Sequence, residues 1–226
     1  MNSDSRNRSG SARARAAATA SSAATRDHPA CRVIQRGDHL CYAGECHEDA
    51  YRLRSGYLIS YLSYEDGGEE IVGLHGPGDI VGAEALLGLA APYSIRATDT
   101  AHVQLLPKAR HVLEHAEGAE AIKLAFQAMH REVLRLTQLL HLDRLPAEQR
   151  LARFLVDFGA RQCGGNRQTV DFRLPITRRE LARYLGLAPE TLSRTFNSLE
   201  GQGLIAADNH EVSILELDRL RQIATR

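Results

Sequence analysis

Residues 177–199 hold the feature that most constrains the fold of this chain, a pattern for two short helices joined by a tight turn. Thr177 and Glu180 have the spacing of a capping box, in which each side chain satisfies a backbone amide of the other residue at a helix start. Gly186 stands where the chain must turn, a position that favours a residue tolerant of positive φ. Pro189 suits the first turn of a second helix, where a missing N–H costs nothing. Together these residues predict a helix-turn-helix.

The second of these helices has two chemically distinct faces. Leu192, Phe196 and Leu199 recur at helical spacing and form an apolar stripe. The opposite face carries groups that read base edges, since a carboxylate accepts from cytosine, a guanidinium donates twice to guanine, and a hydroxyl suits several bases. The alternative is an ordinary amphipathic helix whose polar face is merely solvated. We predict that the two helices contact DNA through Thr177, Arg178, Arg179, Pro189, Glu190, Thr191, Ser193, Arg194 and Asn197.

The charge of the chain is balanced overall but unevenly distributed. The 226 residues include 28 basic and 28 acidic side chains. Residues 29–146 hold eleven basic groups against sixteen acidic ones, whereas residues 147–226 hold twelve against ten. A modest basic patch on the helix-turn-helix above an acidic body favours a protein that contacts phosphate at one end. No apolar run approaches the ~20 residues that cross a bilayer, so we expect a soluble, cytoplasmic protein with no membrane partner.

Residues 1–28 differ from the rest of the chain in composition. They are rich in Arg, Ser and Ala, with five arginines against two aspartates, and contain no large apolar residue after Met1. Such a segment cannot bury enough surface to offset its ordering entropy, so we predict a disordered tail. Composition alone would also suit a transit peptide.

Residues 29–117 form a region of short apolar runs separated by glycine-containing turns. The runs are rich in β-branched and aromatic residues, and their turns recur at roughly 8–12-residue intervals, which predicts an all-β sandwich or barrel. The predicted strands are Tyr51–Arg54, Tyr57–Tyr64, Glu70–Leu74, Ile95–Thr98 and His102–Leu106.

Residues 118–144 change to a helical period. Their apolar residues recur at alternating spacings of four and three over about three heptads, which favours a parallel dimer of two such helices. The alternative is a single helix buried within its own domain. Leu124, Leu134, Leu139 and Leu142 lie off the repeat and are available to pack against the β domain. The repeat itself, which we call the seam, consists of Ile122, Phe126, Met129, Val133, Leu136 and Leu140.

Pro146 ends this helix and opens a third unit, residues 146–226. A turn-rich hairpin around Asp208-Asn209 follows the two helices and stands in the position of a wing. The other predicted elements of this unit are a helix over Glu148–Gly159, a strand over Thr169–Leu174 and a final helix over Asp218–Ala224.

Four cysteines occur without a secretory signal, which favours free or reactive thiols in a reducing cytoplasm. Cys31, Cys41 and Cys46 fall near His39 and His47, and these soft ligands would permit a metal, a haem or a redox-active thiol pair. The alternative is a buried strand residue at Cys41 and a turn residue at Cys46, because cysteine is among the most buried residue types. The three cysteines are retained as redox or metal candidates, without a predicted metal site.

A β domain, a dimerising helix and a winged helix-turn-helix in this order resemble the superfamily of the cyclic-AMP receptor protein and the fumarate–nitrate reduction regulator. The resemblance covers about residues 30–220, and its specific motifs lie at 76–82, 96–101, 177–182 and 189–194. It implies an α+β fold with an N-terminal cyclic-nucleotide-binding-like β-roll, a long dimerisation helix and a C-terminal winged helix-turn-helix. It also implies a bacterial homodimer that binds double-stranded DNA and works with RNA polymerase.

The recognition helix is similar to that of the fumarate–nitrate branch. That branch has a Glu-x-x-Ser-Arg signature, which here falls on Glu190, Ser193 and Arg194. The cyclic-AMP branch carries an arginine just before this glutamate, where the present chain has Pro189. The resemblance therefore implies base readout by these three residues on an inverted-repeat operator of the TTGAT type.

The sensor half departs from both branches. Ala83-Glu84 follows Gly82, and Ala91-Pro92-Tyr93 stands where the cyclic-AMP branch carries an arginine that clamps the ring phosphate. An anionic phosphate needs such a fixed guanidinium when it leaves water. The iron–sulfur branch clusters cysteines before the β domain, and residues 1–30 contain none. We therefore expect neither cyclic AMP nor a four-cysteine iron–sulfur cluster, and the signal stays open.

Three functions are compatible with these patterns. The leading one is a homodimeric, sequence-specific transcription regulator whose β-roll senses a signal. The second is a regulator of the same family without a small-molecule effector, controlled by thiol oxidation or by its own abundance. The third is an enzyme, but no nucleophile–base set, paired carboxylates or phosphate-cradling glycine loop stands out, so we expect none.

Overall fold

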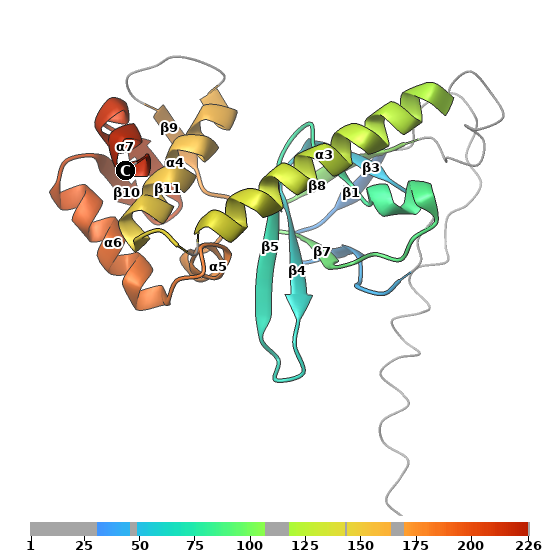
Figure 1. Cartoon of the computed structure of the whole chain (residues 1–226), viewed down its shortest axis with the longest axis horizontal. Helices are drawn as coiled ribbons and strands as arrows, with labels where there is room; N and C mark the ends of the chain where they lie inside the picture. The colour runs from blue at the N-terminus through green and yellow to red at the C-terminus, as the bar shows by residue number, and fades with distance from the viewer. Residues whose placement is uncertain (1–30, 46–48, 107–117, 143, 164–169, 226) are drawn as a thin grey trace, which may run out of the picture.

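The computed structural model describes residues 31–45, 49–106, 118–142, 144–163 and 170–225. Within these ranges a β-roll, a long helix and a small winged domain follow one another along the chain (Figure 1). The α+β class and the order of the three parts agree with the sequence-based prediction. The predicted tail over residues 1–28 lies outside the described residues.

Two four-stranded antiparallel sheets form the β-roll. The five predicted strands agree with the structure within two residues at each end, whereas the sequence pattern predicts no bounds for β1, β2 and β6, which are four, three and two residues long. The first sheet contains, in spatial order, β1 (Cys31–Ile34), β8 (Ala101–Leu105), β3 (Tyr51–Ser55) and β6 (Ile80–Val81). The second contains β2 (His39–Cys41), β7 (Ser94–Ala97), β4 (Leu58–Ser63) and β5 (Glu69–His75), and a 3-10 helix, η1 (Ala83–Leu87), follows β6.

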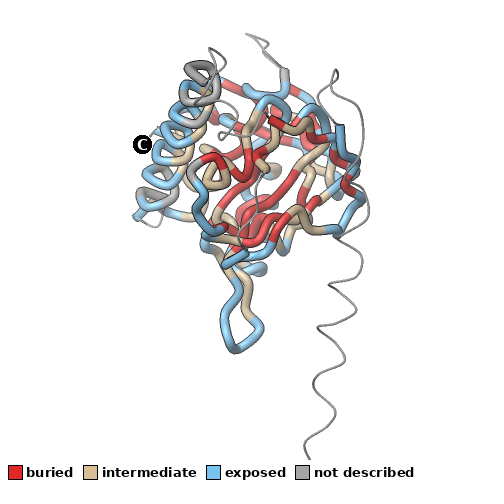
Figure 2. Tube along the Cα trace, turned by 90° about the vertical axis from the view of Figure 1, so that its right-hand side faces the viewer, coloured by how far each residue is buried: buried red, intermediate tan, exposed pale blue. Residues whose placement is uncertain are grey.

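The core of the roll lies between the inward faces of these sheets. Leu53, Leu58, Ile95 and Val103 are all buried there, and Figure 2 shows buried strand segments in the middle of the roll. Gly56 makes the turn between β3 and β4 at φ 79°. A Cβ at this position would lie 2.3 Å from the carbonyl oxygen of Thr100, so the turn requires glycine.

Helix α3 (Gly118–Leu142) runs along one side of the roll, and much of its length is exposed (Figures 1 and 2). Leu124 packs against a small cluster of Ala50, Leu86 and Leu106, as the off-seam position predicts. The prediction for Leu134 is wrong, because its side chain is 51% exposed in this single chain. The side chains of Leu139 and Leu142 lie outside the described residues.

The winged domain follows α3 and contains the predicted wing. The wing turn has Asn209 at φ 51°, a left-handed conformation that asparagine tolerates. The first helix runs four residues beyond its predicted end at Gly159. The elements are α4 (Ala147–Cys163), β9 (Val170–Arg173), α5 (Arg178–Tyr184), α6 (Pro189–Gly201), β10 (Ile205–Asp208), β11 (Glu211–Ile214) and α7 (Leu217–Ala224), with the strands in the order β10-β11-β9.

The β-roll and the winged domain share one buried apolar cluster. Ile59, Tyr61, Ile71 and Leu74 of the roll belong to the same cluster as the core of the winged domain, and α5 packs directly against β5. The two parts of the chain are therefore held in contact by apolar burial, the largest stabilising contribution in proteins. In the part of the chain described, no helix is long and apolar enough to span a bilayer.

Candidate nucleic-acid interface

The start of α5 has the geometry that its sequence predicts. The Thr177 amide donates to Glu180 Oε2 at 2.8 Å, and the Glu180 amide donates to Thr177 Oγ1 at 3.2 Å, which completes the capping box. Gly186 has φ 62° in the turn, and Pro189 occupies the first turn of α6. Two short helices are thus fixed against each other by local interactions that the sequence encodes within a dozen residues.

Helix α6 has one buried face and one exposed face. Leu192, Phe196 and Leu199 are 1%, 4% and 0% exposed and hold the helix on the domain core. Thr195 is also buried, and its hydroxyl donates to the Thr191 carbonyl within the helix. On the other side, the three residues predicted to read base edges, Glu190, Ser193 and Arg194, are exposed, and so is the predicted DNA contact Asn197.

The remaining predicted DNA contacts divide into exposed and partly buried side chains. Pro189 and Arg179 are exposed, whereas Thr177 and Thr191 are half-buried. The Ser193 hydroxyl donates to the Pro189 carbonyl at 3.0 Å, so a base contact by Ser193 requires its hydroxyl to accept or to rotate.

Arg178 and Arg179 have different environments, although both are predicted to contact DNA. The guanidinium of Arg178 stacks 3.4 Å from the centre of the Phe196 ring. Burial lowers the pKa of Arg178, the nearby Glu200 opposes this shift, and Nη1 is buried without a partner among the described residues. Arg179 points into solvent, where a phosphate would meet it without any rearrangement.

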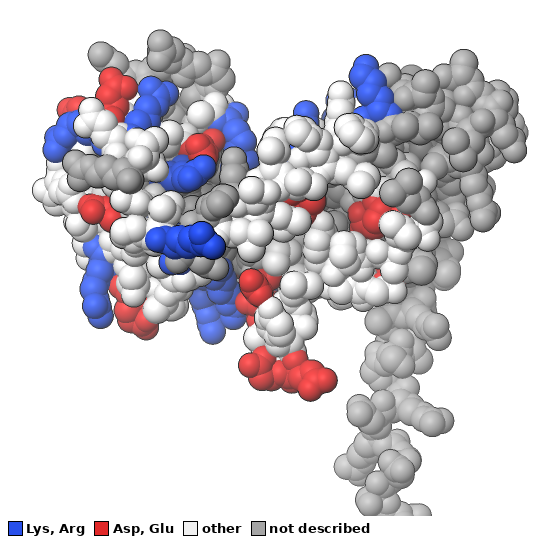
Figure 3. Space-filling model, viewed as in Figure 1, with Lys and Arg blue, Asp and Glu red and all other residues white. Residues whose placement is uncertain are grey.

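The surface charges of the described residues agree with the prediction that the protein contacts phosphate at one end. Arginine side chains gather over the winged domain, and acidic side chains gather at the tip of the β4–β5 hairpin (Figure 3). The hairpin turn carries Glu65 and Asp66, and both are exposed. A polyanion would therefore be attracted to the winged domain and repelled by the hairpin tip.

The seam of α3 presents an apolar face to solvent in this single chain. Among its described side chains, Phe126 and Leu140 are each 73% exposed, Val133 59%, Met129 52% and Leu136 39%. The side chain of Ile122 lies outside the described residues. Burial of the helix within its own domain is therefore the wrong alternative for these five positions. An apolar stripe of this length is typical of a surface that a second helix covers.

The cysteine candidates do not form a site in the described residues. Cys31 is exposed on β1, and Cys41 is buried on β2. Burial raises the pKa of the Cys41 thiol to about 12, so this thiol is protonated and poorly nucleophilic at neutral pH. Cys46 lies outside the described residues, as does the side chain of Cys163. No group of three or more His, Cys, Asp or Glu side chains in the described ranges is arranged to hold a metal ion.

A cavity of about 250 Å³ lies between the β-roll and α3, beside η1. Its charged lining residues, among those described, are Glu84 and Glu132, and the Tyr93 hydroxyl donates to Glu132 at 2.7 Å. Ala91, in the stretch that replaces the clamp, is buried in the roll. Arg96 does not line the cavity. Glu132 is itself paired with Arg135, and none of the described residues that line the cavity is an arginine or a lysine, so the lining offers a cyclic phosphate no cationic clamp.

A winged helix-turn-helix with an exposed polar recognition helix defines the class of DNA-binding transcription regulators. Family models refine this assignment. A Crp-like helix-turn-helix domain matches residues 149–223, and a cyclic nucleotide-binding domain matches residues 31–112.

Known relatives identify the family. The transcriptional activator protein Anr of Pseudomonas protegens is 32% identical over 194 residues, covering 85% of this chain and 80% of the relative. The fumarate and nitrate reduction regulatory protein of Escherichia coli is 30% identical over 202 residues, covering 85% and 78%. The chain belongs to the Crp/Fnr superfamily of transcription regulators, as its resemblance predicts.

Solved structures agree on the fold. FixK2 from Bradyrhizobium japonicum has a TM-score of 0.74 at 23% identity, covering 87% of this chain and 98% of that protein. A CRP-family regulator from Thermus thermophilus has a TM-score of 0.70 at 27% identity, covering 86% and 97%. The β-roll, the long helix and the winged domain are thus an arrangement that other members of the superfamily share.

Proposed function

We propose that two copies of this chain form a homodimer that reads an inverted-repeat operator of the TTGAT type through Glu190, Ser193 and Arg194. The observation that carries this proposal is the exposed polar face of α6 on a helix whose opposite face is buried in its domain. Each half-site of this type contains a G·C pair, which offers a guanine edge to a guanidinium and a cytosine amine to a carboxylate. Arg194 and Glu190 supply these two groups.

The dimer supplies the second half of the readout. Five exposed apolar side chains along α3 support pairing of two parallel copies of this helix. A two-fold axis along the pair would place the two copies of α6 on half-sites about one helical turn apart. Arg179, Thr177 and the neighbouring residues of α5 and α6 are proposed to contact phosphates and to fix the register, without contributing to base preference.

We propose regulation of transcription, and not catalysis, as the activity of the chain. The relatives include proteins named as transcriptional activators, and this supports RNA polymerase as a partner. The signal sensed by the β-roll is not assigned. Thiol control through Cys41 is disfavoured by the high pKa of that residue, whereas the exposed thiol of Cys31 is compatible with it.

Fluorescence anisotropy on a labelled duplex with two inverted TTGAT half-sites tests this function. The full chain should bind the duplex as a dimer, with affinity that falls steeply as salt rises and at least about a thousandfold preference over a scrambled duplex. The variant Arg219→Ala removes an exposed arginine from α7 and serves as the charge-matched control for variants on α6. Equal affinity for both duplexes would contradict the proposal.

A further inference from the structure

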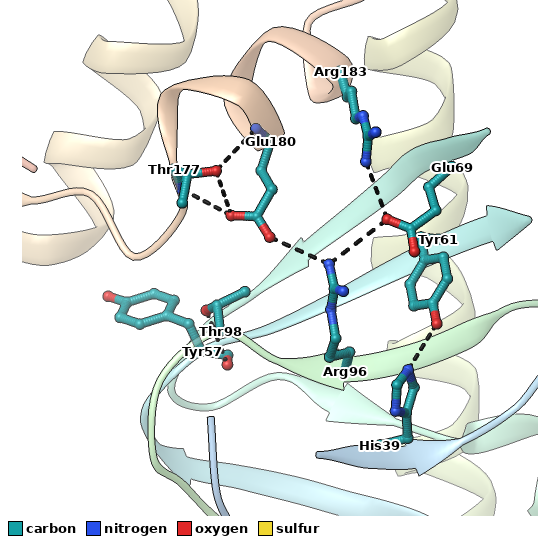
Figure 4. Close-up of polar contacts among 9 residues, drawn as sticks. All are labelled: His39, Tyr57, Tyr61, Glu69, Arg96, Thr98, Thr177, Glu180 and Arg183. Atoms are coloured by element: carbon teal, nitrogen blue, oxygen red, sulfur yellow. Dashed lines mark hydrogen bonds and ion pairs between the residues drawn. The ribbon is translucent and has the colours of Figure 1, made fainter. Parts of the chain in front are cut away.

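Four charged side chains join the β-roll to α5, the first helix of the helix-turn-helix (Figure 4). Arg96 on β7 donates from Nη2 to Glu180 Oε1 at 3.3 Å, and the same nitrogen lies 3.8 Å from Glu69 Oε2 on β5. Arg183, on the last turn of α5, donates from Nη1 to Glu69 Oε2 at 3.1 Å. We call Arg96, Glu69, Glu180 and Arg183 the junction cluster.

The junction cluster holds α5 at two points. Glu180, in its first turn, bonds Arg96, and Arg183, in its last turn, bonds Glu69; these two roll residues lie 3.8 Å apart. Apolar packing already holds α5 against β5, and two polar contacts on successive turns of the helix add a constraint on its direction. Because Glu180 also completes the capping box with Thr177, the arginine of the roll is bonded directly to the turn where α5 begins.

The side chains of the cluster are packed and balanced in charge. They are 20–32% exposed, and two arginines alternate with two glutamates. Such partly buried pairs are screened by salt less than pairs on an open surface. Removal of Arg96 would leave two carboxylates facing one arginine. The cluster borders the apolar contact of Ile71 with the winged domain. Apolar packing holds the roll and the winged domain together, and the charged pairs determine the orientation of α5.

Residues on two other strands of the same sheet hold Arg96 in place. Its guanidinium carbon lies 5.3 Å from the centre of the Tyr61 ring, and the Tyr61 hydroxyl lies 2.7 Å from Nε2 of His39. Tyr61 is buried on β4 and His39 is half-buried on β2, so three strands of one sheet determine where the guanidinium points. A displacement of that sheet would be passed to the start of α5.

We propose that Arg96 and Glu69 are positioning residues for DNA binding, which hold α5 and hence α6 in the orientation that a two-fold operator requires. The inference rests on the proposed function. In the described structure the polar face of α6 is open to solvent while the cluster is formed. If the helix-turn-helix of each subunit swung freely, binding two half-sites at once would carry an added ordering cost. The junction cluster fixes the orientation of α5 and α6 in the free protein, so that this ordering cost is not incurred on binding.

Replacement of Arg96 by glutamine in the full-length dimer is the first test. Arg96→Gln should weaken operator binding about five- to tenfold, an effect expected for partly exposed charged hydrogen bonds, while the dependence of affinity on salt stays unchanged because no phosphate contact is lost. Arg96→Lys should recover most of the affinity, since a single positive charge can serve both carboxylates. Arg54→Gln, which removes an exposed arginine from β3, is the matched control.

A charge exchange keeps the proposal testable if Arg96→Gln destabilises the roll. Glu69→Arg and Arg183→Glu should each weaken operator binding, and the double variant should return to within about threefold of the original chain. Thermal unfolding of every variant separates loss of fold from loss of orientation. Unchanged or tighter operator binding by stably folded Arg96→Gln would overturn the positioning role, as would a double variant no better than its parents. If the unaltered chain fails to prefer the inverted repeat, the proposed function itself is wrong.

Discussion

The guanidinium of Arg178 lies over the ring of Phe196, with 3.4 Å between the guanidinium carbon and the ring centre. This contact joins the first turn of α5 to the buried face of α6. It gives Arg178 a role in packing the two helices, in addition to any contact with phosphate. Its neighbour Arg179 has no such contact among the described residues and is exposed.

Alanine substitutions should separate these two roles. Arg178→Ala should lower the free energy of unfolding by about 1–2 kcal/mol, because it removes a cation–π contact and the packing of the arginine stem. Arg179→Ala should leave the free energy of unfolding unchanged and weaken specific and random DNA alike, with a smaller salt slope. Urea unfolding and anisotropy on both duplexes measure the two effects. Equal stability of the two variants would contradict the packing role.

The seam makes a prediction about assembly. Val133 is 59% exposed in the single chain, and Val133→Asp would place a charge between two helices if the seam is their interface. Sedimentation should then show monomers, and operator affinity should be almost lost. Gln127→Asp changes an exposed residue of α3 that lies off the seam, and this control should remain dimeric. A Val133→Asp chain that stays dimeric would place the interface elsewhere.

The buried histidine of β5 predicts how stability depends on pH. Burial, with a smaller contribution from Arg135, lowers the pKa of His75 from 6.5 to about 4, and Ser60 Oγ lies 2.6 Å from its Nε2. The unfolded chain therefore binds a proton that the folded chain excludes. The stability gained from neutral His75 is complete above pH 6.5 and is lost as the pH falls toward 4, by up to about 3 kcal/mol.

Replacement of His75 isolates this effect from other titrating groups. His75→Gln keeps a side chain able to bond Ser60, and its free energy of unfolding should fall less steeply between pH 6.5 and 4 than that of the original chain. His102→Gln, which replaces an exposed histidine of β8, is the matched control for the substitution itself. Urea unfolding at half-unit pH steps gives both slopes, and identical slopes for His75→Gln and the original chain would refute the assignment.

The cavity of about 250 Å³ between the β-roll and α3 predicts that cyclic AMP is not the effector. Glu84 and Glu132 line the cavity, and Arg96 is engaged with Glu69 and Glu180 outside it. A cyclic phosphate entering this cavity would lose its hydration without gaining a paired cation. Calorimetric titration with millimolar cyclic AMP should show no saturable heat and no change in operator affinity. Micromolar binding would show that an arginine moves to serve as the clamp.

The sequence predicts local features of this protein well. The capping box of Thr177 and Glu180, the turn at Gly186 and the two faces of α6 depend on residues only a few positions apart, so their spacing carries the information. Glycine turns likewise predict where strands begin and end. Leu134 shows where this local information ends. The helical period places it off the seam but does not tell whether it packs against the β-roll, and it is exposed.

Contacts between distant segments could not be predicted. Arg96 and Glu180 are 84 positions apart, and nothing in either neighbourhood indicates that β7 and α5 meet. The stack of Arg178 on Phe196 depends on how two helices cross, which periodicity does not give. Such pairings follow from tertiary packing, and the Arg96–Glu180 pair links the β-roll to α5.

Base readout by Arg194 is the central claim, and a matrix of protein and operator variants tests it most directly. Anisotropy would be measured for the original chain and for Arg194→Ala on the inverted repeat and on duplexes whose half-site G·C pair is replaced by A·T. The original chain should lose roughly 1–3 kcal/mol per half-site on the altered duplex, whereas Arg194→Ala should bind both duplexes about equally. If Arg194→Ala loses the same affinity on operator and random DNA and still discriminates the G·C pair, Arg194 contacts the backbone and α6 does not read the operator as described.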